Sequence, residues 1–126
     1  MTAHLMAQAA YGAAKQAALK TPRNVEYDIF AQVTARLRAA EAAGKPAFPA
    51  LVAALHDNRQ LWTTLAADVA ESDNRLPEAL RAKLFYLARF TQDHSRKVLA
   101  GQDSAGVLVE INMAVMRGLA TQGQAA

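Results

Sequence analysis

The side chains that could perform acid–base or metal chemistry in this chain are its three histidines and eleven carboxylates. General acid–base catalysis and metal binding both need such groups at matched positions. His56 and Asp57 are adjacent, but no further ligand follows at a known metal-site spacing. Asp93-His94-Ser95 contains the residue types of a hydrolase triad, yet neighbours on a helix point about 100° apart. The glycines stand singly and form no phosphate-binding or dinucleotide-binding loop. The sequence therefore predicts no catalytic residue, no metal site and no cofactor.

The polar block His56-Asp57-Asn58-Arg59, which interrupts an apolar helical stripe, is the more informative feature. Between residues 49 and 70 the stripe recurs every three or four residues, through Leu51, Leu55, Asn58, Trp62, Leu65 and Val69. Asn58 thus lies in the middle of a hydrophobic seam. A buried carboxamide without partners costs about 1–3 kcal/mol, so we expect Asn58 to form hydrogen bonds with a neighbouring helix. A core Asn of this kind would fix which helices pack together, as polar residues set register in coiled coils.

Asn112 raises the same question on the last predicted helix, where it is close in phase to Leu108 and Val115. It is a candidate partner for Asn58, or for a backbone carbonyl across the bundle. Met113 and Met116 lie on another side of that helix. They are open to two interpretations, as core filler or as an adaptable surface for an apolar partner.

Arg59 and Glu26 are also open to two interpretations. Arg59 follows Asn58, and Glu26 lies near the start of the preceding predicted helix. They could form an ordinary interhelical ion pair, or they could recognise the backbone of a partner. The candidate partner-binding residues are accordingly Asn58, Arg59, Trp62, Glu26, Asn112, Met113 and Met116.

Composition sets the broad class of this protein. With 126 residues, 52% of them hydrophobic, the chain can form one domain, residues 1–126, with a substantial core. Cysteine is absent, which excludes disulfides and thiol chemistry and suits a reducing cytosol. We recognise no secretory signal and no stretch that approaches a membrane span, so a cytoplasmic location is expected. The net charge is only +3, and basic residues are spread among acidic ones, which weakens a nucleic-acid interpretation.

Abundant alanine, few β-branched residues and no strictly alternating run predict an all-α fold. We expect a compact bundle of four main helices plus a weaker N-terminal helix, with short loops that favour antiparallel neighbours. Its main helices are expected from Thr21-Pro22 to near Gly44, from about Pro49 to Ala70, from Pro77 to about Ala100, and from Asp103 or Ser104 through Leu119. Pro46 and Pro49 are assigned to a connector.

The two ends of the chain are expected to be less stable than residues 22–120. Residues 2–20 are rich in alanine, contain few large apolar side chains and include Gly12. Such a segment can form a helix but has little to hold it on the core. Residues 121–126 are expected to form a frayed tail.

Several motifs together resemble those of one protein family. They are Ala10-Tyr11, Thr21-Pro22-Arg23-x-x-Glu26, Ala54-Leu55-x-x-Asn58-Arg59-x-Leu61-Trp62, Asn74-x-Leu76-Pro77, His94-Ser95-x-x-Val98-Leu99 and Ile111-Asn112-x-x-Val115-Met116-x-Gly118-Leu119. Each motif alone is weak, but the combination is specific and covers almost the whole chain. It resembles the FlaF family of bacterial flagellar biosynthesis proteins.

The resemblance implies a small cytoplasmic protein needed for flagellin production and filament assembly, acting with a FlbT-type translational regulator. Members of the family are described both as regulators of flagellin synthesis and as flagellin-binding secretion chaperones. We favour the chaperone because flagellin termini are amphipathic helices that stay unpaired until polymerisation, and a helical bundle can cover them. In this hypothesis the N-terminal helix moves aside and a flagellin helix docks along the seam around Trp62, with Arg59 and Asn58 fixing its register.

The alternative is a post-transcriptional regulator that acts through the FlbT-type protein or directly on flagellin mRNA. RNA-binding proteins usually present a basic surface with aromatic residues for stacking. Here tyrosine and phenylalanine are few, and we expect most of them at core positions, which disfavours direct RNA binding. Oligomeric state remains open, because a weakly held first helix could be exchanged between two copies.

Overall fold

The computed structural model describes residues 22–125, and side chains within residues 27–118. This part of the chain contains four α-helices, one 3-10 helix and no strand. The elements are α2 (Pro22–Ala43), η2 (Lys45–Ala47), α3 (Phe48–Ala70), α4 (Glu78–Leu99) and α5 (Gly106–Ala125). The predicted all-α bundle of four main helices is therefore confirmed. The weaker helix expected over residues 2–20 lies outside the described residues.

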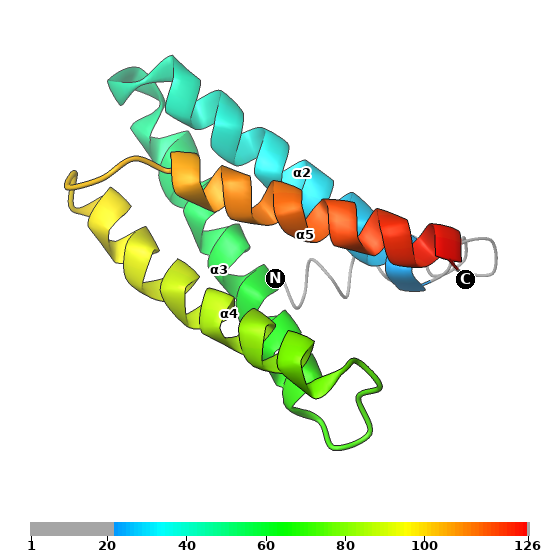
Figure 1. Ribbon diagram of the computed structural model, residues 1–126. Helices are drawn as coiled ribbons and strands as arrows, with labels where there is room; N and C mark the ends of the chain where they lie inside the picture. Colours follow the sequence, from blue (N-terminus) through cyan, green and yellow to red (C-terminus); the bar gives the residue numbers. More distant parts are fainter. Residues whose placement is uncertain (1–21, 126) are drawn as a thin grey trace.

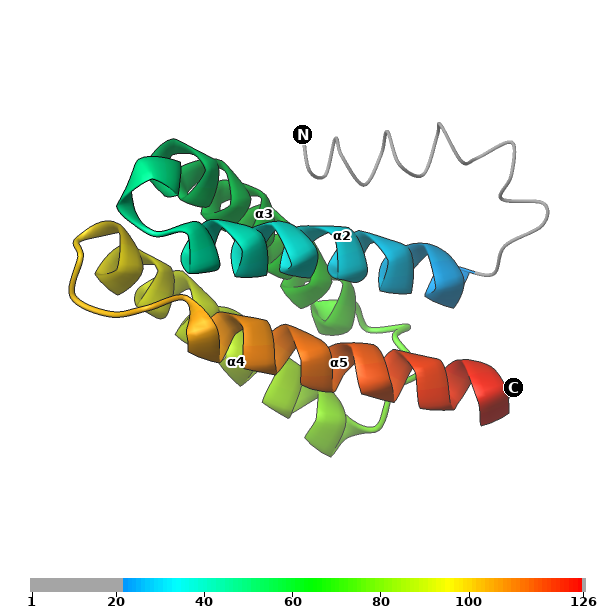
Figure 2. The ribbon, with the colours of Figure 1, turned by 90° about the horizontal axis from the view of Figure 1, so that it is seen from above.

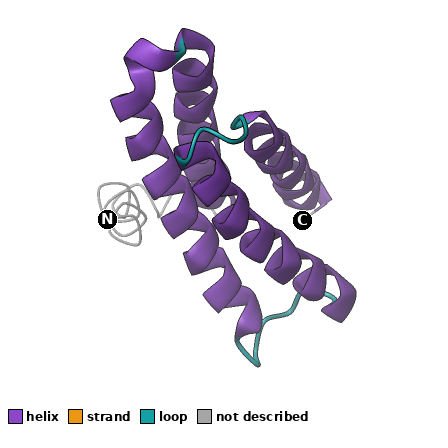
Figure 3. Ribbon diagram, turned by 90° about the vertical axis from the view of Figure 1, so that its left-hand side faces the viewer, coloured by secondary structure: helices purple, strands orange, loops and turns teal. Residues whose placement is uncertain are grey.

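The helices form two antiparallel pairs, α2 with α5 and α3 with α4 (Figures 1 and 2). The pairs lie close together at the end that carries η2 and the α4–α5 loop, and they diverge toward the other end (Figure 1). Figure 3 shows that loop crossing from one pair to the other. Because α2 also packs on α3, the α2 and α3 helices form the centre of the bundle. α4 packs mainly on α3 and touches α5 little, so much of its surface has no neighbouring helix in the described structure.

Two glycines follow the ends of helices, and both helices end where the sequence predicts. Gly44, after α2, and Gly101, after α4, have φ angles of 75° and 74°, a conformation that residues with a Cβ rarely adopt. At Gly101 the amide donates to the Val98 carbonyl, and the next amide, of Gln102, donates to the Lys97 carbonyl. These paired bonds form a Schellman motif, which satisfies carbonyls left free at the end of α4.

The structure differs from the expected connector at one proline. Pro46 lies in η2, but Pro49 is the second residue of α3 and not part of a loop. A proline at this position breaks no hydrogen bond, because the first amides of a helix have no partner within the helix. The α3–α4 loop agrees with the expectation, and the Asn74 side chain organises it by accepting from the Leu76 amide and donating to the Asp68 carbonyl.

The last helix is longer than expected, since α5 continues to Ala125 through most of the segment predicted as a tail. Its start depends on a residue from α2. The Glu41 carboxylate accepts a hydrogen bond from the Ala105 amide at 3.1 Å, and the Ser104 hydroxyl accepts one from the Gly106 amide at 3.3 Å. Glu41 thus stabilises the positive end of the α5 dipole from a neighbouring helix.

Replacing Glu41 with alanine is expected to lower the free energy of unfolding by about 0.5–2 kcal/mol, the usual cost of removing a helix cap. Urea unfolding followed by circular dichroism would measure the change. Glu110→Ala, at an exposed glutamate within α5, is the matched control. An equal loss in the two variants would contradict a capping role for Glu41.

The core fills the space between α2, α3 and α5 and reaches the inner side of α4. Phe30 of α2 meets Trp62 of α3 edge to face, with ring centroids 5.8 Å apart. The fully buried large side chains are Trp62, Phe30, Leu37, Leu55, Leu61, Leu108 and Val33. The predicted α3 seam is confirmed at Leu55, Asn58, Trp62 and Val69, which are all buried.

Candidate functional site

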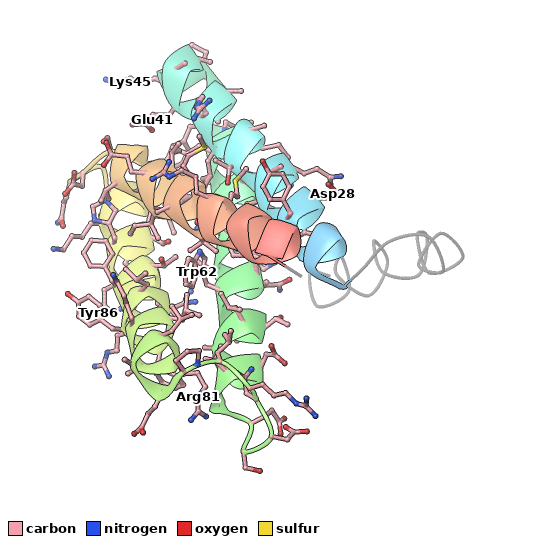
Figure 4. All side chains as sticks on the ribbon, turned by 45° about the vertical axis from the view of Figure 1, so that its right-hand side comes forward. Asp28, Glu41, Lys45, Trp62, Arg81 and Tyr86 are labelled. Atoms are coloured by element: carbon pink, nitrogen blue, oxygen red, sulfur yellow. The ribbon has the colours of Figure 1, made fainter. Side chains whose placement is uncertain are left out.

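A chain of hydrogen bonds joins α3 to α5 inside the bundle. The Trp62 indole N–H donates to Asn112 Oδ1 at 2.9 Å, and Asn112 Nδ2 donates to Asn58 Oδ1 at 2.8 Å. All three side chains have 0% of their surface exposed, and Figure 4 shows Trp62 inside the bundle. The predicted contact between Asn58 and Asn112 is therefore confirmed. Trp62, singled out from the sequence for its place on the seam, is the third member of the network.

One polar group of this network has no partner among the described residues. Asn58 Nδ2 is buried without a hydrogen-bond acceptor. An unpaired buried N–H costs about 1–3 kcal/mol, so a core optimised for stability alone would place an apolar side chain here. We infer that the network is retained because it sets one packing of α5 on α3, as a buried Asn sets register in coiled coils.

Arg59 forms a separate clamp between α3 and α4. Its Nε donates to Gln92 Oε1 at 3.1 Å, while Gln92 Nε2 donates back to the Arg59 carbonyl and to Thr63 Oγ1. Gln92 was not singled out from the sequence, since nothing in its spacing reveals which side chain it faces. Glu26 lies in α2, but its side chain is outside the described residues, so its proposed pairing with Arg59 stays a prediction.

The other five candidate partner-binding residues fall into two groups. Asn58, Trp62 and Asn112 have no exposed surface, so they could touch a partner only if the bundle opened. Met113 and Met116 are half-buried on α5 and reach the surface, and Met116 also packs against the core. Their role in partner binding stays a prediction.

The histidines and acids singled out for possible chemistry have structural roles or lie apart. His94 Nε2 lies 2.9 Å from the Ser104 carbonyl, which can only accept, so this nitrogen carries the proton. The His94 ring also stacks on Phe90, with centroids 5.5 Å apart. Asp93 pairs with Arg96, and His56 is exposed. Over residues 22–125 no cluster of three or more acids and histidines could hold a metal ion.

The outward side of α4 is a feature that the sequence analysis missed. Phe85 and Tyr86 have exposed fractions of 51% and 67%, and Phe48 at the start of α3 is 46% exposed. The expectation that aromatic residues occupy mostly core positions is wrong for these three. Phe85 and Tyr86 lie outside the side of α4 that is buried on the bundle, and the sequence does not show that this side lacks a covering helix.

Positive charge is concentrated on the same helix. α4 carries five basic residues and two acidic ones, an excess of three. The whole chain also has a formal net charge of +3, so the remainder of the chain is balanced. Basic residues are thus spread along the chain without forming a run, but α4 carries the whole excess of positive charge. A basic helix with exposed aromatic rings is a surface suited to an acidic or anionic partner.

Comparison with known proteins gave one result. A family model described as Flagellar protein FlaF matches residues 7–119, a range that includes all seven candidate partner-binding residues. Searches of curated proteins and of solved structures gave no match. Within the described part of the chain, no helix is long and apolar enough to cross a membrane.

Proposed function

The chain belongs to the FlaF family of flagellar proteins, and from this premise we propose that it is a cytoplasmic secretion chaperone for flagellin. It binds the terminal amphipathic helices of flagellin, keeps them from associating early, and so promotes flagellin export and filament assembly. It catalyses no reaction and needs no cofactor. Family membership supports the flagellar role. The proposal of chaperone activity is based on how the four helices pack.

The observation that carries the proposal is the unequal covering of the four helices. α4 packs mainly on α3, whereas α2 and α3 are packed on more than one neighbour. Half-buried hydrophobic side chains line the edges of the core on three helices, namely Leu51, Leu65, Leu84, Leu87, Leu99, Val107, Val109, Ile111, Val115 and Met116. An added amphipathic helix can cover such side chains as a further member of the bundle, a common mode of peptide recognition.

The buried network gives this proposal a different mechanism from the one expected on sequence. Trp62 and Asn58 stabilise α3 from the inside in the described structure, so a flagellin helix need not reach them to bind. Partner contact falls instead to side chains at the surface. The bundle then acts as a preformed support, which lowers the entropic cost of binding.

Binding of purified flagellin to the full chain tests the proposal. Isothermal titration calorimetry should show binding to intact flagellin and none to flagellin that lacks its terminal helices. The negative heat-capacity change expected for burial of apolar surface provides a second readout. Equal binding to the truncated flagellin, or no binding to the intact protein at high concentration, would refute the chaperone proposal.

The second candidate is regulation of flagellin synthesis, through the FlbT-type regulator or by direct binding to flagellin mRNA. The sequence disfavoured direct RNA binding, whereas the structure favours it more, because Phe85 and Tyr86 are exposed on a basic helix. RNA-binding surfaces combine basic and aromatic side chains. Strong binding to labelled flagellin transcript that weakens steeply with salt would support direct RNA binding. Co-purification with the regulator in the absence of flagellin would support the indirect route.

A further inference from the structure

We propose that the outward face of α4 is the docking surface and that its occupant is an amphipathic helix with acidic flanks. This face comprises Lys83, Phe85, Tyr86, Arg89, Arg96 and Lys97, all of them exposed. The inference rests on the proposed function, because the helix it describes is a segment of flagellin. It adds the location of the site and the charge that its partner must carry.

The helical phase of α4 separates this face from the core. Ala88, Thr91, Ser95 and Val98 are the buried residues that face the bundle together with His94. Tyr86 lies on the opposite side, and Figure 4 shows it directed away from the other helices. Arg89 and Lys97 follow Tyr86 by three and eleven residues, so they continue the same side of the helix. The face is therefore one continuous surface.

Aromatic rings provide the apolar part of the surface. Tyr86 is two-thirds exposed, and Phe90, one turn further along, is half-buried. Phe90 stacks on His94, which hydrogen-bonds to the Ser104 carbonyl, so contacts within the bundle orient the Phe90 ring. Leu87 adjoins Phe90 and extends the apolar strip toward the core. Tyrosine, phenylalanine and arginine are the residues enriched at protein–protein interfaces.

Charge determines the character of the partner. The acidic Asp93 pairs with Arg96 at 2.9 Å, but Lys83, Arg89 and Lys97 have no ion pair within the described structure. These three cations lie on both sides of the aromatic strip and along its length. A partner helix with carboxylates beside its apolar stripe would match them, and such complementarity favours fast association and correct orientation.

The length of the surface suits a helix as the partner. With a rise of about 1.5 Å per residue, the distance from Lys83 to Lys97 is roughly 21 Å, or about four turns of a partner helix. Leu87 and Phe90, both half-buried, border the exposed rings on the side toward the core and add apolar surface that the apolar stripe of an amphipathic helix can cover.

Two double variants of the full chain test the inference. Lys83→Glu with Arg89→Glu reverses the charge of the face, and Phe85→Ser with Tyr86→Ser removes its exposed rings. Arg38→Glu with Lys45→Glu is the matched control, since these two exposed cations lie on α2 and η2 and change the net charge equally. Circular dichroism should show the same helicity in all variants because every substituted side chain is exposed.

The probes are intact flagellin and two synthetic amphipathic helical peptides that differ only in glutamate or lysine flanks. We expect the unaltered protein to bind flagellin and the glutamate peptide, and to bind the lysine peptide at least about tenfold more weakly. Charge reversal and ring removal should each weaken binding about tenfold or more, a change of about 1.4 kcal/mol, and the control should change it less than about twofold.

The outcomes separate this inference from the proposed function. If flagellin binds the unaltered protein and all variants alike, the α4 face is refuted and the chaperone stands. If the glutamate peptide binds as expected and flagellin does not, the chaperone is refuted and the docking surface stands. An oligouridylate that binds the unaltered protein but not the charge-reversed one, with neither peptide bound, would overturn the inference and assign the face to RNA.

Discussion

Replacing Trp62 with alanine is expected to lower the free energy of unfolding by about 3–5 kcal/mol, the usual cost of removing a large buried aromatic side chain. Trp62 has no exposed surface, meets the Phe30 ring edge to face and donates a hydrogen bond to Asn112. Its removal leaves a cavity and an amide oxygen without a donor. A small domain has only about 5–15 kcal/mol of stability, so this variant should be partly unfolded at moderate temperature.

Far-UV circular dichroism during urea unfolding would measure this loss, because the substitution removes the single tryptophan on which fluorescence depends. Phe48→Ala is the matched control, since Phe48 is a large aromatic residue at the surface and should change stability by less than about 1 kcal/mol. Trp62→Phe keeps an aromatic ring while it removes the hydrogen-bond donor and part of the indole volume, so we expect a loss smaller than that of Trp62→Ala. Similar losses for Trp62→Ala and Phe48→Ala would contradict the central position of Trp62.

Replacing Asn112 with alanine should have the second largest effect, about 2–4 kcal/mol. This one substitution removes two hydrogen bonds and leaves the Trp62 N–H and Asn58 Oδ1 buried without partners. Each unpaired buried group costs about 1–3 kcal/mol. The loss should therefore exceed that of an alanine substitution at the half-buried neighbour Met113, although Met113 has the larger side chain.

A double-mutant cycle on Asn58 and Asn112 tests whether the two residues form one unit. Asn58→Leu and Asn112→Leu should each destabilise the protein, whereas the double variant should lose less than the sum by about 1–2 kcal/mol. The reason is that the second substitution removes the group that the first left unpaired. Additive losses would show that the two amides act independently and would remove the case for a network that selects one packing of α5 on α3.

The core variants and the α4 variants report on different properties, namely stability and partner binding. Asn58, Trp62 and Asn112 are buried, so their variants report on how α5 is held on α3. The α4 face is exposed, so its variants report on the partner. In Trp62→Ala, flagellin binding should fall in proportion to the fraction of unfolded protein. In the Lys83→Glu and Arg89→Glu double variant, binding should fall although the protein stays folded.

Much of the secondary structure follows from the sequence, because helix boundaries depend on local constraints. Pro22 begins α2, and Gly44 and Gly101 end α2 and α4 with backbone angles that glycine adopts most easily. Periodicity also places Asn58 on a buried seam. Because a buried amide needs a partner, the sequence made Asn112 a candidate to pair with Asn58 or with a backbone carbonyl, and the structure shows the pairing with Asn58. The extra length of α5 was missed because alanine and glutamine are compatible with either a frayed end or a helix.

The sequence by itself thus determined the main helices and the α3 seam, and it required a hydrogen-bond partner for the buried Asn58, since each depends on backbone geometry or on the cost of an unpaired polar group. The tertiary structure identified Asn112 as that partner. Only the tertiary structure decided which flank of α4 stays uncovered. Periodicity shows which residues share a side of a helix, but exposure depends on how many neighbours pack against that side. For the same reason the Glu41 contact with Ala105, between residues 64 positions apart, is visible only in the folded bundle.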